Sequence, residues 1–195
     1  MADNLLKAER HKQLREWVGV HPFAGDEELA HTFGVSVQTI RLDRMALGIP
    51  ELRERIRAMA QQTYGAVKSM GAREIVGDLL DLELGSRGLS ILETRRDMVF
   101  ERSRVVRGQY IFAQAESLAI ALIDAEMALT GLANVKFRRP VQVGERLVAK
   151  GQVLDRRHNR YTVLVETHAG PEKVFRGKFL IFALEGEGRL IADRD

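Results

Sequence analysis

The spacing of apolar and polar positions divides the chain into two parts. Up to about residue 70, apolar residues recur every three or four positions, which is typical of amphipathic helices. From Glu74 onward, apolar runs and alternating residues predominate, which is typical of β-strands. One long apolar stretch, residues 105–124, interrupts the strand pattern and predicts a buried helix. We therefore expect an α+β protein whose N-terminal part is helical.

Three short helices are predicted before residue 50. His21-Pro22 ends the first, because a residue before proline avoids helical angles. Asp26 is expected to cap the second helix, which Gly34 ends through a tight turn, and Ser36 is expected to cap the third. Four apolar residues among charged ones define the first helix: Leu5, Leu14, Trp17 and Val18.

The second and third helices, joined through a turn glycine, predict a helix-turn-helix. Ala30 is small where the two helices would cross, and four residues fall on positions that should pack inward: Leu29, Phe33, Val35 and Ile40. In this motif the second helix enters the major groove of DNA, where glutamine suits adenine and arginine suits guanine. The predicted DNA contacts are Ser36, Gln38, Thr39, Arg41, Leu42 and Arg44. The competing interpretation is a generic helical pair with surface arginines.

A linker helix is predicted to follow, with Pro50 at a favourable first position. Its apolar stripe consists of Leu52, Ile56 and Met59. Arg53 and Arg55 are predicted to contact the adjacent minor groove, although each would serve equally well as a solvated surface charge. Gly65 and Gly71 mark a hinge after this helix.

The second part of the chain predicts a sheet wrapped around one helix. Apolar runs at 75–84 and 89–92 are separated by the turn sequence GSRG, and about four alternating segments follow the apolar helix. The apolar face of that helix holds Phe112, Ala115, Ala119, Leu122 and Ile123, and further alanines, including Ala128, would let a sheet approach on several sides. A curved antiparallel sheet around a central helix is the hot-dog fold. The predicted domains are therefore a helix-turn-helix at 1–49, a linker and hinge at 50–72, and a hot-dog domain at 73–195.

Composition narrows the possibilities further. The chain has no cysteine, which excludes disulfides and thiolate metal sites, and we expect no metal and no cofactor. It has no apolar run long enough to span a membrane, and its first ten residues lack the apolar middle of a signal peptide, so we expect a cytoplasmic protein. Residues 101–160 carry 11 Lys or Arg against 6 Asp or Glu, which indicates either a polyanion partner or a solvated surface.

Three segments resemble the FapR family, the malonyl-CoA-responsive repressors of fatty-acid and phospholipid biosynthesis in Gram-positive bacteria: DEELAHTFGVSVQTIRLDRMALGIPELRERI, RGQYIFAQAESLAIALID and ALTGLANVKFRRPVQVGERLVAKGQV. The resemblance covers nearly the whole chain, although VSVQTIRLD alone is also similar to DeoR-type regulators. It implies a homodimer that binds an inverted-repeat operator in double-stranded DNA. It also implies that malonyl-CoA in the hot-dog domain releases the operator.

The resemblance also implies an effector site. Arg107 and Gly108 match the family's RG sequence ahead of the hot-dog helix, so Arg107 would pair with the malonyl carboxylate and Gly108 would approach the acyl group. Phe100 matches a phenylalanine that lines the malonyl pocket. Several basic residues remain candidates for the coenzyme A phosphates: Arg138, Arg139, Arg146, Lys150 and the RRHNR turn.

Glu116 departs from the family pattern, which has asparagine in the sequence FAQANSL. Three interpretations are open: a structural carboxylate, neutral or paired with an arginine; a residue that tunes effector preference; or a base that preserves thioester hydrolysis. A single carboxylate does not hydrolyse a thioester without an aligned water and an oxyanion donor, so no catalytic residue is predicted. The alternatives to a malonyl-CoA-responsive regulator are a thioesterase with an accessory DNA-binding domain, a regulator for another acyl-CoA, or a DNA-binding protein whose second half only dimerises it.

Overall fold

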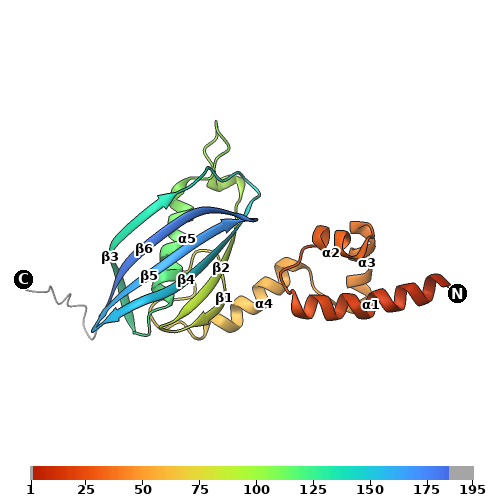
Figure 1. Cartoon of the computed structure of the whole chain (residues 1–195), viewed down its shortest axis with the longest axis horizontal. Coiled ribbons are helices and arrows are strands. Elements are labelled where there is room, and N and C mark those ends of the chain that lie inside the picture. Colours follow the sequence, from red (N-terminus) through yellow and green to blue (C-terminus); the bar gives the residue numbers. More distant parts are fainter. Residues whose placement is uncertain (1, 185–195) are drawn as a thin grey trace, which may run out of the picture. The chain divides into compact units, whose positions relative to one another are not determined.

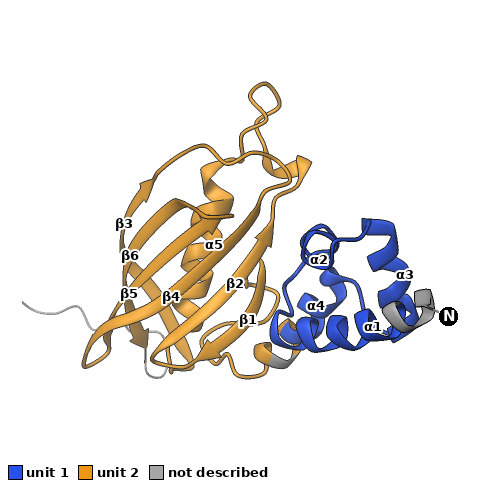
Figure 2. Cartoon of the chain, turned by 45° about the vertical axis from the view of Figure 1, so that its right-hand side comes forward, with its two compact units in different colours: residues 1–59 blue, residues 60–195 orange. Residues whose placement is uncertain are grey.

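The computed structural model describes the backbone of residues 2–184 and the side chains of residues 7–184 other than Gln62 (Figure 1). The side chain of Leu5 and the segment 185–195 of the predicted hot-dog domain thus lie outside the described part of the chain. The chain forms two compact units, which divide between Met59 and Ala60 (Figure 2). The three-part division into 1–49, 50–72 and 73–195 stays a prediction.

The N-terminal unit begins with three helices, α1 (Ala2–Val20), α2 (Asp26–Phe33) and α3 (Val37–Leu47). α2 ends at Gly34, whose φ of 62° allows its N–H to reach the carbonyls of Ala30 and His31. Ser36 caps α3 as predicted, since its Oγ accepts a hydrogen bond from the Thr39 N–H at 3.0 Å. The prediction for Asp26 was wrong: Gly25 holds the cap position and Asp26 is the first helical residue.

Apolar side chains from all three helices form the core of this unit. Its buried members are Leu14, Val18, Ala24, Leu29, Ala30 and Ile40. Trp17, Phe33 and Val35 are half-buried and pack against them. The inward positions predicted for the helix-turn-helix are confirmed, because the 3.6-residue period alone decides which face of a short helix is apolar.

The linker helix α4 (Leu52–Tyr64) begins two residues later than predicted, so Pro50 precedes the helix instead of opening it. Its predicted stripe is present, with Ile56 buried and Leu52 and Met59 half-buried. Leu52 lies beside the short α1–α2 connection, 3.7 Å from the position that a Cβ on Gly25 would occupy. The first turn of α4 is therefore packed against the N-terminal unit.

The C-terminal unit contains one six-stranded antiparallel sheet of order β1-β2-β4-β5-β6-β3. Its strands are β1 (Asp78–Glu83), β2 (Arg87–Glu93), β3 (Met127–Phe137), β4 (Arg146–Arg157), β5 (Arg160–Ala169) and β6 (Glu172–Leu184). A short 3-10 turn, η1 (Arg96–Met98), follows β2. Two strands before the apolar helix and four after it match the predicted order.

The apolar helix α5 (Gly108–Ala121) packs against one face of the sheet and touches β2 to β6 (Figure 1). Ala115 and Ala119 are completely buried, as are Leu122 and Ile123 just beyond the helix, while Phe112 is half-buried. The predicted hot-dog fold is confirmed. Ala128, which was assigned to the helix, belongs to β3, because the chain leaves the helix after Ala121.

The segment 64–72, predicted as a hinge, contacts the hot-dog domain along its length, and its role as a hinge stays a prediction. Ser69 Oγ donates to the carbonyl of Ile120 at 2.8 Å, and Lys68 Nζ pairs with Asp124 at 2.7 Å. Val67 and Met70 pack against the hot-dog core. Among the helices of residues 2–184, none is both long and apolar enough to cross a membrane.

Candidate functional site

The outward face of α3 is the candidate DNA interface. Gln38, Arg41, Leu42 and Met45 are exposed, and Thr39 is half-buried beside the Ser36 cap. Ser36 Oγ also lies 2.9 Å from Thr39 Oγ1, so the two hydroxyls form one polar group at the start of the helix. Five of the six predicted DNA contacts are thus accessible on α3 and at its N-cap.

Arg44 is the exception, and its assignment to base contacts was wrong. It is 3% exposed, and its guanidinium donates to both carboxylate oxygens of Asp26, at 2.7 and 3.0 Å, and to the carbonyl of Ile49 at 3.0 Å. Burial raises the pKa of Asp26, but hydrogen bonds and charge from Arg44 and Arg41 outweigh it and hold that pKa below its ordinary value. Arg44 therefore joins α2, α3 and the start of the linker.

A second carboxylate, which is buried, holds α3 to α1. Asp43 is 2% exposed and accepts hydrogen bonds from Arg10 Nε at 2.7 Å and from His11 Nε2 at 2.8 Å. Burial raises the pKa of Asp43, but the hydrogen bonds from Arg10 and His11 outweigh it, so the pKa lies below its ordinary value. α1 is thereby joined to α3 by a charged network.

Arg55 is also occupied within the N-terminal unit. Its guanidinium donates to the carbonyls of Pro22, Ala24 and Pro50 at 3.1, 2.7 and 2.6 Å. The prediction that Arg55 enters the minor groove was therefore wrong, since its donors hold the linker to the helix-turn-helix. Arg53 is exposed on the same helix and remains a candidate for DNA contact.

A pocket of about 420 Å³ at the start of α5 is the candidate effector site. Gly108, Ile111, Phe137, Arg138 and Arg139 contribute to its lining, together with Val105, Val106, Pro140 and Val141. Its walls come from the chain entering α5 and from the end of β3, which the sheet topology brings together. The site is apolar inside and basic at its rim.

Of the four predicted effector residues, only Gly108 lines this pocket. Arg107 is adjacent to it and directs its guanidinium to the preceding loop. Its Nη2 donates to the carbonyl of Asp97 at 2.6 Å and to the Tyr110 hydroxyl at 2.7 Å, and the Tyr110 ring centroid lies 5.0 Å from its Cζ. Nη1 of Arg107 donates no hydrogen bond to any group that the structure describes.

Phe100 and Glu116 lie outside the pocket lining. Phe100 is 55% exposed in the loop between η1 and α5, where its N–H donates to the carbonyl of Val105 at 2.9 Å. Glu116 is half-buried, about 12 Å along α5 from Gly108 at the usual rise per residue. The described part of the chain provides Glu116 with no arginine partner, so the arginine-paired interpretation lacks support there.

The basic residues that were candidates for the coenzyme A phosphates do not lie at one site. Arg138 and Arg139 lie at the pocket, but Arg139 is paired with Glu145 at 2.8 Å and Glu172 at 2.6 Å. A hydrogen bond from Arg139 lowers the pKa of Glu145. Arg146 lies 3.7 Å from Glu93. Arg138 is exposed and is the pocket cation with the most accessible charge.

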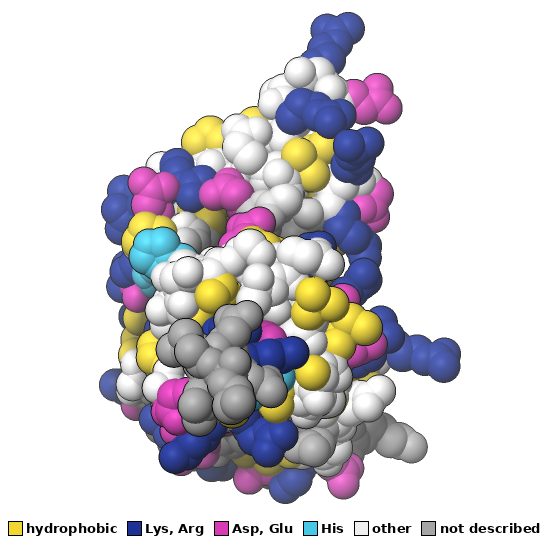
Figure 3. All heavy atoms as spheres, turned by 90° about the vertical axis from the view of Figure 1, so that its right-hand side faces the viewer, with side chains coloured by type: hydrophobic (Ala, Val, Ile, Leu, Met, Phe, Trp, Pro, Cys, Tyr) yellow, Lys and Arg dark blue, Asp and Glu magenta, His cyan; other side chains and the backbone are white. Residues whose placement is uncertain are grey.

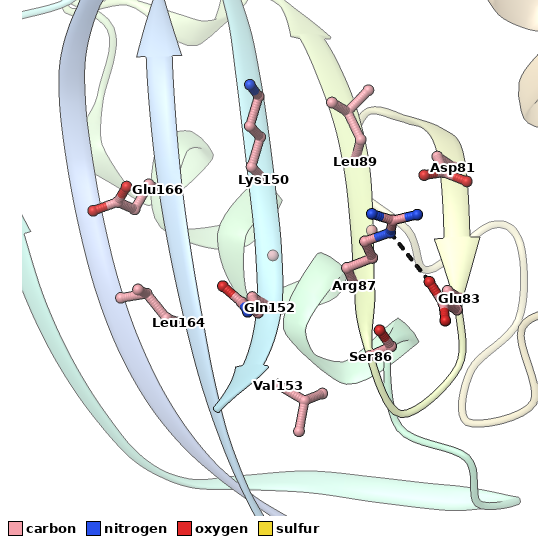
Figure 4. Close-up of a pocket in the computed structure, with 12 residues that line it drawn as sticks. Asp81, Glu83, Ser86, Arg87, Leu89, Lys150, Gln152, Val153, Leu164 and Glu166 are labelled. Atoms are coloured by element: carbon pink, nitrogen blue, oxygen red, sulfur yellow. Dashed lines mark ion pairs between the residues drawn. The ribbon is translucent and has the colours of Figure 1, made fainter. Parts of the chain in front are cut away.

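Lys150 lies in a different hollow, of about 820 Å³, across β1, β2, β4 and β5 (Figure 4). A Cβ added to Gly151 would meet Leu122, so position 151 of β4 faces α5. Its neighbour Lys150 points to the opposite face of the sheet, and this hollow therefore lies on the face away from α5. Arg87 and Glu83 form an ion pair of 3.1 Å inside it. None of the predicted effector residues lines this hollow.

Sequence reasoning missed Phe137, Ile111 and Met45. Phe137 follows an alternating strand and gave no signal of its own, because only the sheet topology brings the end of β3 to the start of α5. Met45 continues the spacing of Gln38 and Leu42 at i+7 and could have been found from the helical period. Among residues 2–184, no three His, Asp or Glu side chains gather as a possible metal site.

Comparison with known proteins identifies the family of the chain. The profile of the Thioesterase superfamily matches residues 105–175. "Transcription factor FapR" of Caldanaerobacter subterraneus subsp. tengcongensis is 56% identical over 185 residues, covering 95% of this chain and 92% of the relative. The protein of the same name from Thermoanaerobacter sp. (strain X514) is 53% identical, with the same coverage. A sigma28-regulated virulence protein from Campylobacter jejuni has a similar fold, with a TM-score of 0.61 at 20% identity, covering 66% of this chain and 92% of that protein.

Proposed function

The chain belongs to the FapR family of transcription factors, and from this premise we propose that it represses fatty-acid and phospholipid biosynthesis genes and leaves its operator when malonyl-CoA binds the hot-dog domain. Its operator would be an inverted repeat in double-stranded DNA, bound by a homodimer in the cytoplasm. The single observation that carries this proposal is the presence in one chain of an accessible α3 face and of a pocket at the start of α5.

The α3 face has the properties that base recognition requires. Gln38 and Arg41 are exposed near its start, while the other two charged residues of the helix, Asp43 and Arg44, are buried. The outward surface of α3 therefore carries one positive charge and no negative charge, which suits the phosphate-lined major groove. The hydroxyl groups of Ser36 and Thr39, which are hydrogen-bonded to each other, add a polar group at the helix start.

The pocket at α5 supports an acyl-CoA effector. Its apolar walls suit an acyl chain and thioester, and Arg107 lies beside Gly108 with an Nη1 that donates to no described group. Malonyl-CoA differs from acetyl-CoA by one carboxylate, and an arginine is well suited to read that difference. Arg138 at the rim is available to a phosphate of the nucleotide.

The edge of the sheet at β3 supports homodimerisation. β3 is the last strand in the sheet order, so one side of its backbone has no strand partner among residues 2–184. It exposes several large apolar side chains, namely Met127, Leu129, Leu132 and Phe137. Pairing of two β3 edges would cover these residues and extend the sheet. Because Phe137 also lines the pocket, the effector site would adjoin the dimer interface.

Release requires the effector to bind the DNA-incompetent arrangement of the dimer more tightly than the DNA-bound one. We propose a binding assay on an operator selected by the protein itself, titrated with malonyl-CoA, acetyl-CoA and free CoA. Malonyl-CoA alone should weaken operator binding, and it alone should raise the thermal midpoint beyond the effect of CoA. Equal shifts with all three ligands would point to a regulator of another acyl-CoA.

A thioesterase is the second candidate, favoured by the match to the Thioesterase superfamily and by the half-buried carboxylate of Glu116 on α5. Relatives with more than half of their residues identical to this chain are transcription factors and not enzymes. Steady release of CoA from malonyl-CoA or acetyl-CoA, lost on Glu116→Gln, would favour the thioesterase.

A further inference from the structure

Two large apolar side chains stand on the outward face of the recognition helix. Leu42 is 57% exposed and Met45 is 76% exposed, one turn apart on α3. Among the described side chains of the N-terminal unit, the other exposed large hydrophobic is Val20, at the end of α1. A single exposed hydrophobic side chain is ordinary on a protein surface. Two adjacent ones on a helix that faces a polar groove indicate an apolar binding partner.

We infer that Leu42 and Met45 contact thymine methyl groups in the major groove and so determine part of the operator sequence. This inference rests on the proposed function, because it needs α3 to be the recognition helix. The C5-methyl of thymine is the one apolar group that the base pairs present in the major groove, and apolar side chains recognise it.

The geometry of α3 places the two residues correctly for this role. Gln38, Leu42 and Met45 follow at i, i+4 and i+7, so they form one row about 10 Å long. That length corresponds to about three base steps along one strand. Gln38 at the start of the row would hydrogen-bond to a base edge, while Leu42 and then Met45 contact methyl groups further along.

Charge also favours DNA over a protein as the partner of this row. Arg41 is exposed next to it, and the acidic residue of the same helix, Asp43, is turned inward and held by Arg10 and His11. On the face drawn in Figure 3, the apolar side chains lie among cationic and other groups and do not merge into one broad apolar area. Met45 has an unbranched, flexible side chain that can adapt to a groove wall.

The test uses the whole protein and a duplex that it selects from a random-sequence pool. Each thymine of the selected duplex is replaced in turn by deoxyuridine, which removes the methyl group and keeps base pairing. Wild-type protein should lose about fourfold in affinity at one or two thymines of each half-site, the value expected for one buried methyl group. Leu42→Ala should abolish discrimination at one thymine, and Met45→Ala at another further from the position that Gln38 reads.

Val20→Ala is the matched control, since it removes a similarly exposed apolar side chain outside α3 and should leave every thymine effect intact. If wild-type protein selects a sequence but tolerates every deoxyuridine, or if both variants discriminate as wild type does, the inference fails while the proposed function stands. Variants that alter the oligomeric state without altering thymine discrimination would make this row a protein interface and overturn the inference. A wild-type protein that selects no sequence would overturn the proposed function together with it.

Discussion

The Cα of Gly108 lies against the ring of Phe137: a Cβ added to Gly108 would be 3.2 Å from both Cε1 and Cζ of that ring. Gly108 is the first residue of α5 and Phe137 is the last residue of β3, so this contact closes one side of the pocket. The ring also packs edge-on against Phe175, with centroids 5.1 Å apart. The lack of a side chain at position 108 therefore sets the width of the candidate effector site.

Gly108→Ala should weaken malonyl-CoA binding by about tenfold, because the added methyl must displace the Phe137 ring into the pocket or out of it. The measurement is ligand-dependent thermal shift or calorimetric titration of the purified protein. Phe137→Leu in the Gly108→Ala background should recover part of the affinity by making room. Gly19→Ala, where an added Cβ meets nothing within 4 Å, is the control. Unchanged affinity in Gly108→Ala would place the ligand elsewhere.

Arg107→Ala should remove the preference for malonyl-CoA over acetyl-CoA while leaving free CoA binding little changed. The variant also loses hydrogen bonds to the carbonyl of Asp97 and to Tyr110, so we expect a stability loss of about 1 kcal/mol without ligand. Arg102→Ala, in the exposed loop nearby, is the control for a general loss of positive charge. Retained discrimination in Arg107→Ala would assign the carboxylate to another cation, with Arg138 the next to be replaced.

Arg41 and Arg44 provide a matched pair of arginines on one helix. Arg41→Ala should reduce operator affinity with little change in stability. The Arg41 side chain is 59% exposed, and its Nε comes no closer than 3.4 Å to the Asp26 carboxylate, so this ion pair contributes little. Arg44→Ala should instead destabilise the N-terminal unit by about 3 kcal/mol, since it leaves the Asp26 carboxylate without its main partner. Chemical denaturation and operator titration of both variants measure the two effects. A stable Arg44→Ala protein with lost base preference would restore Arg44 as a DNA contact.

The N-terminal unit should lose stability in acid. Asp26 and Asp43 both have a pKa below the ordinary value in the folded state, so their contribution is complete above the unfolded-state pKa of about 4 and declines as pH falls through the folded values. Trp17 is the single tryptophan of the chain, so its fluorescence reports this unit selectively. Asp43→Asn should flatten the decline below pH 4 and cost about 2 kcal/mol at pH 7. Equal acid sensitivity in wild type and variant would mean that Asp43 is not the cause.

Glu116→Gln should raise the affinity for malonyl-CoA and leave acetyl-CoA binding unchanged, if the carboxylate of Glu116 repels that of the ligand. Two like charges that are partly withdrawn from water repel each other more strongly than in bulk solvent. Glu126→Gln, an exposed carboxylate outside α5, is the control. Affinity that is unchanged in Glu116→Gln would leave Glu116 without influence on the effector.

Local pattern was sufficient for the elements and their order. The helical period located Leu29 and Ile40 in the core, and the turn residues Gly34 and Ser36 defined the α2–α3 turn, because caps and turns depend on a few neighbouring residues. The order of two strands, one apolar helix and four strands likewise predicted a sheet around α5. The family resemblance supplied the expected ligand, which periodicity alone does not indicate.

The roles of individual arginines required the tertiary structure. Arg41 and Arg44 are three residues apart on α3, and nothing in their sequence spacing distinguishes an exposed guanidinium from one buried against Asp26. The role of Arg55 was equally ambiguous from the sequence, because the three carbonyls to which it donates come from separate segments. A guanidinium that finds enough partners within the fold is no longer available to DNA, and those partners come from distant parts of the chain.

The sequence by itself thus determined the α+β architecture, the central helix and the face of α3 that points outward, because these follow from local periodicity and capping. Only the tertiary structure decided which charged side chains are paired inside the fold and which residues form the pocket. Phe137 meets Gly108 because α5 packs against the sheet that contains β3, and this contact joins residues 29 positions apart, which no local pattern encodes.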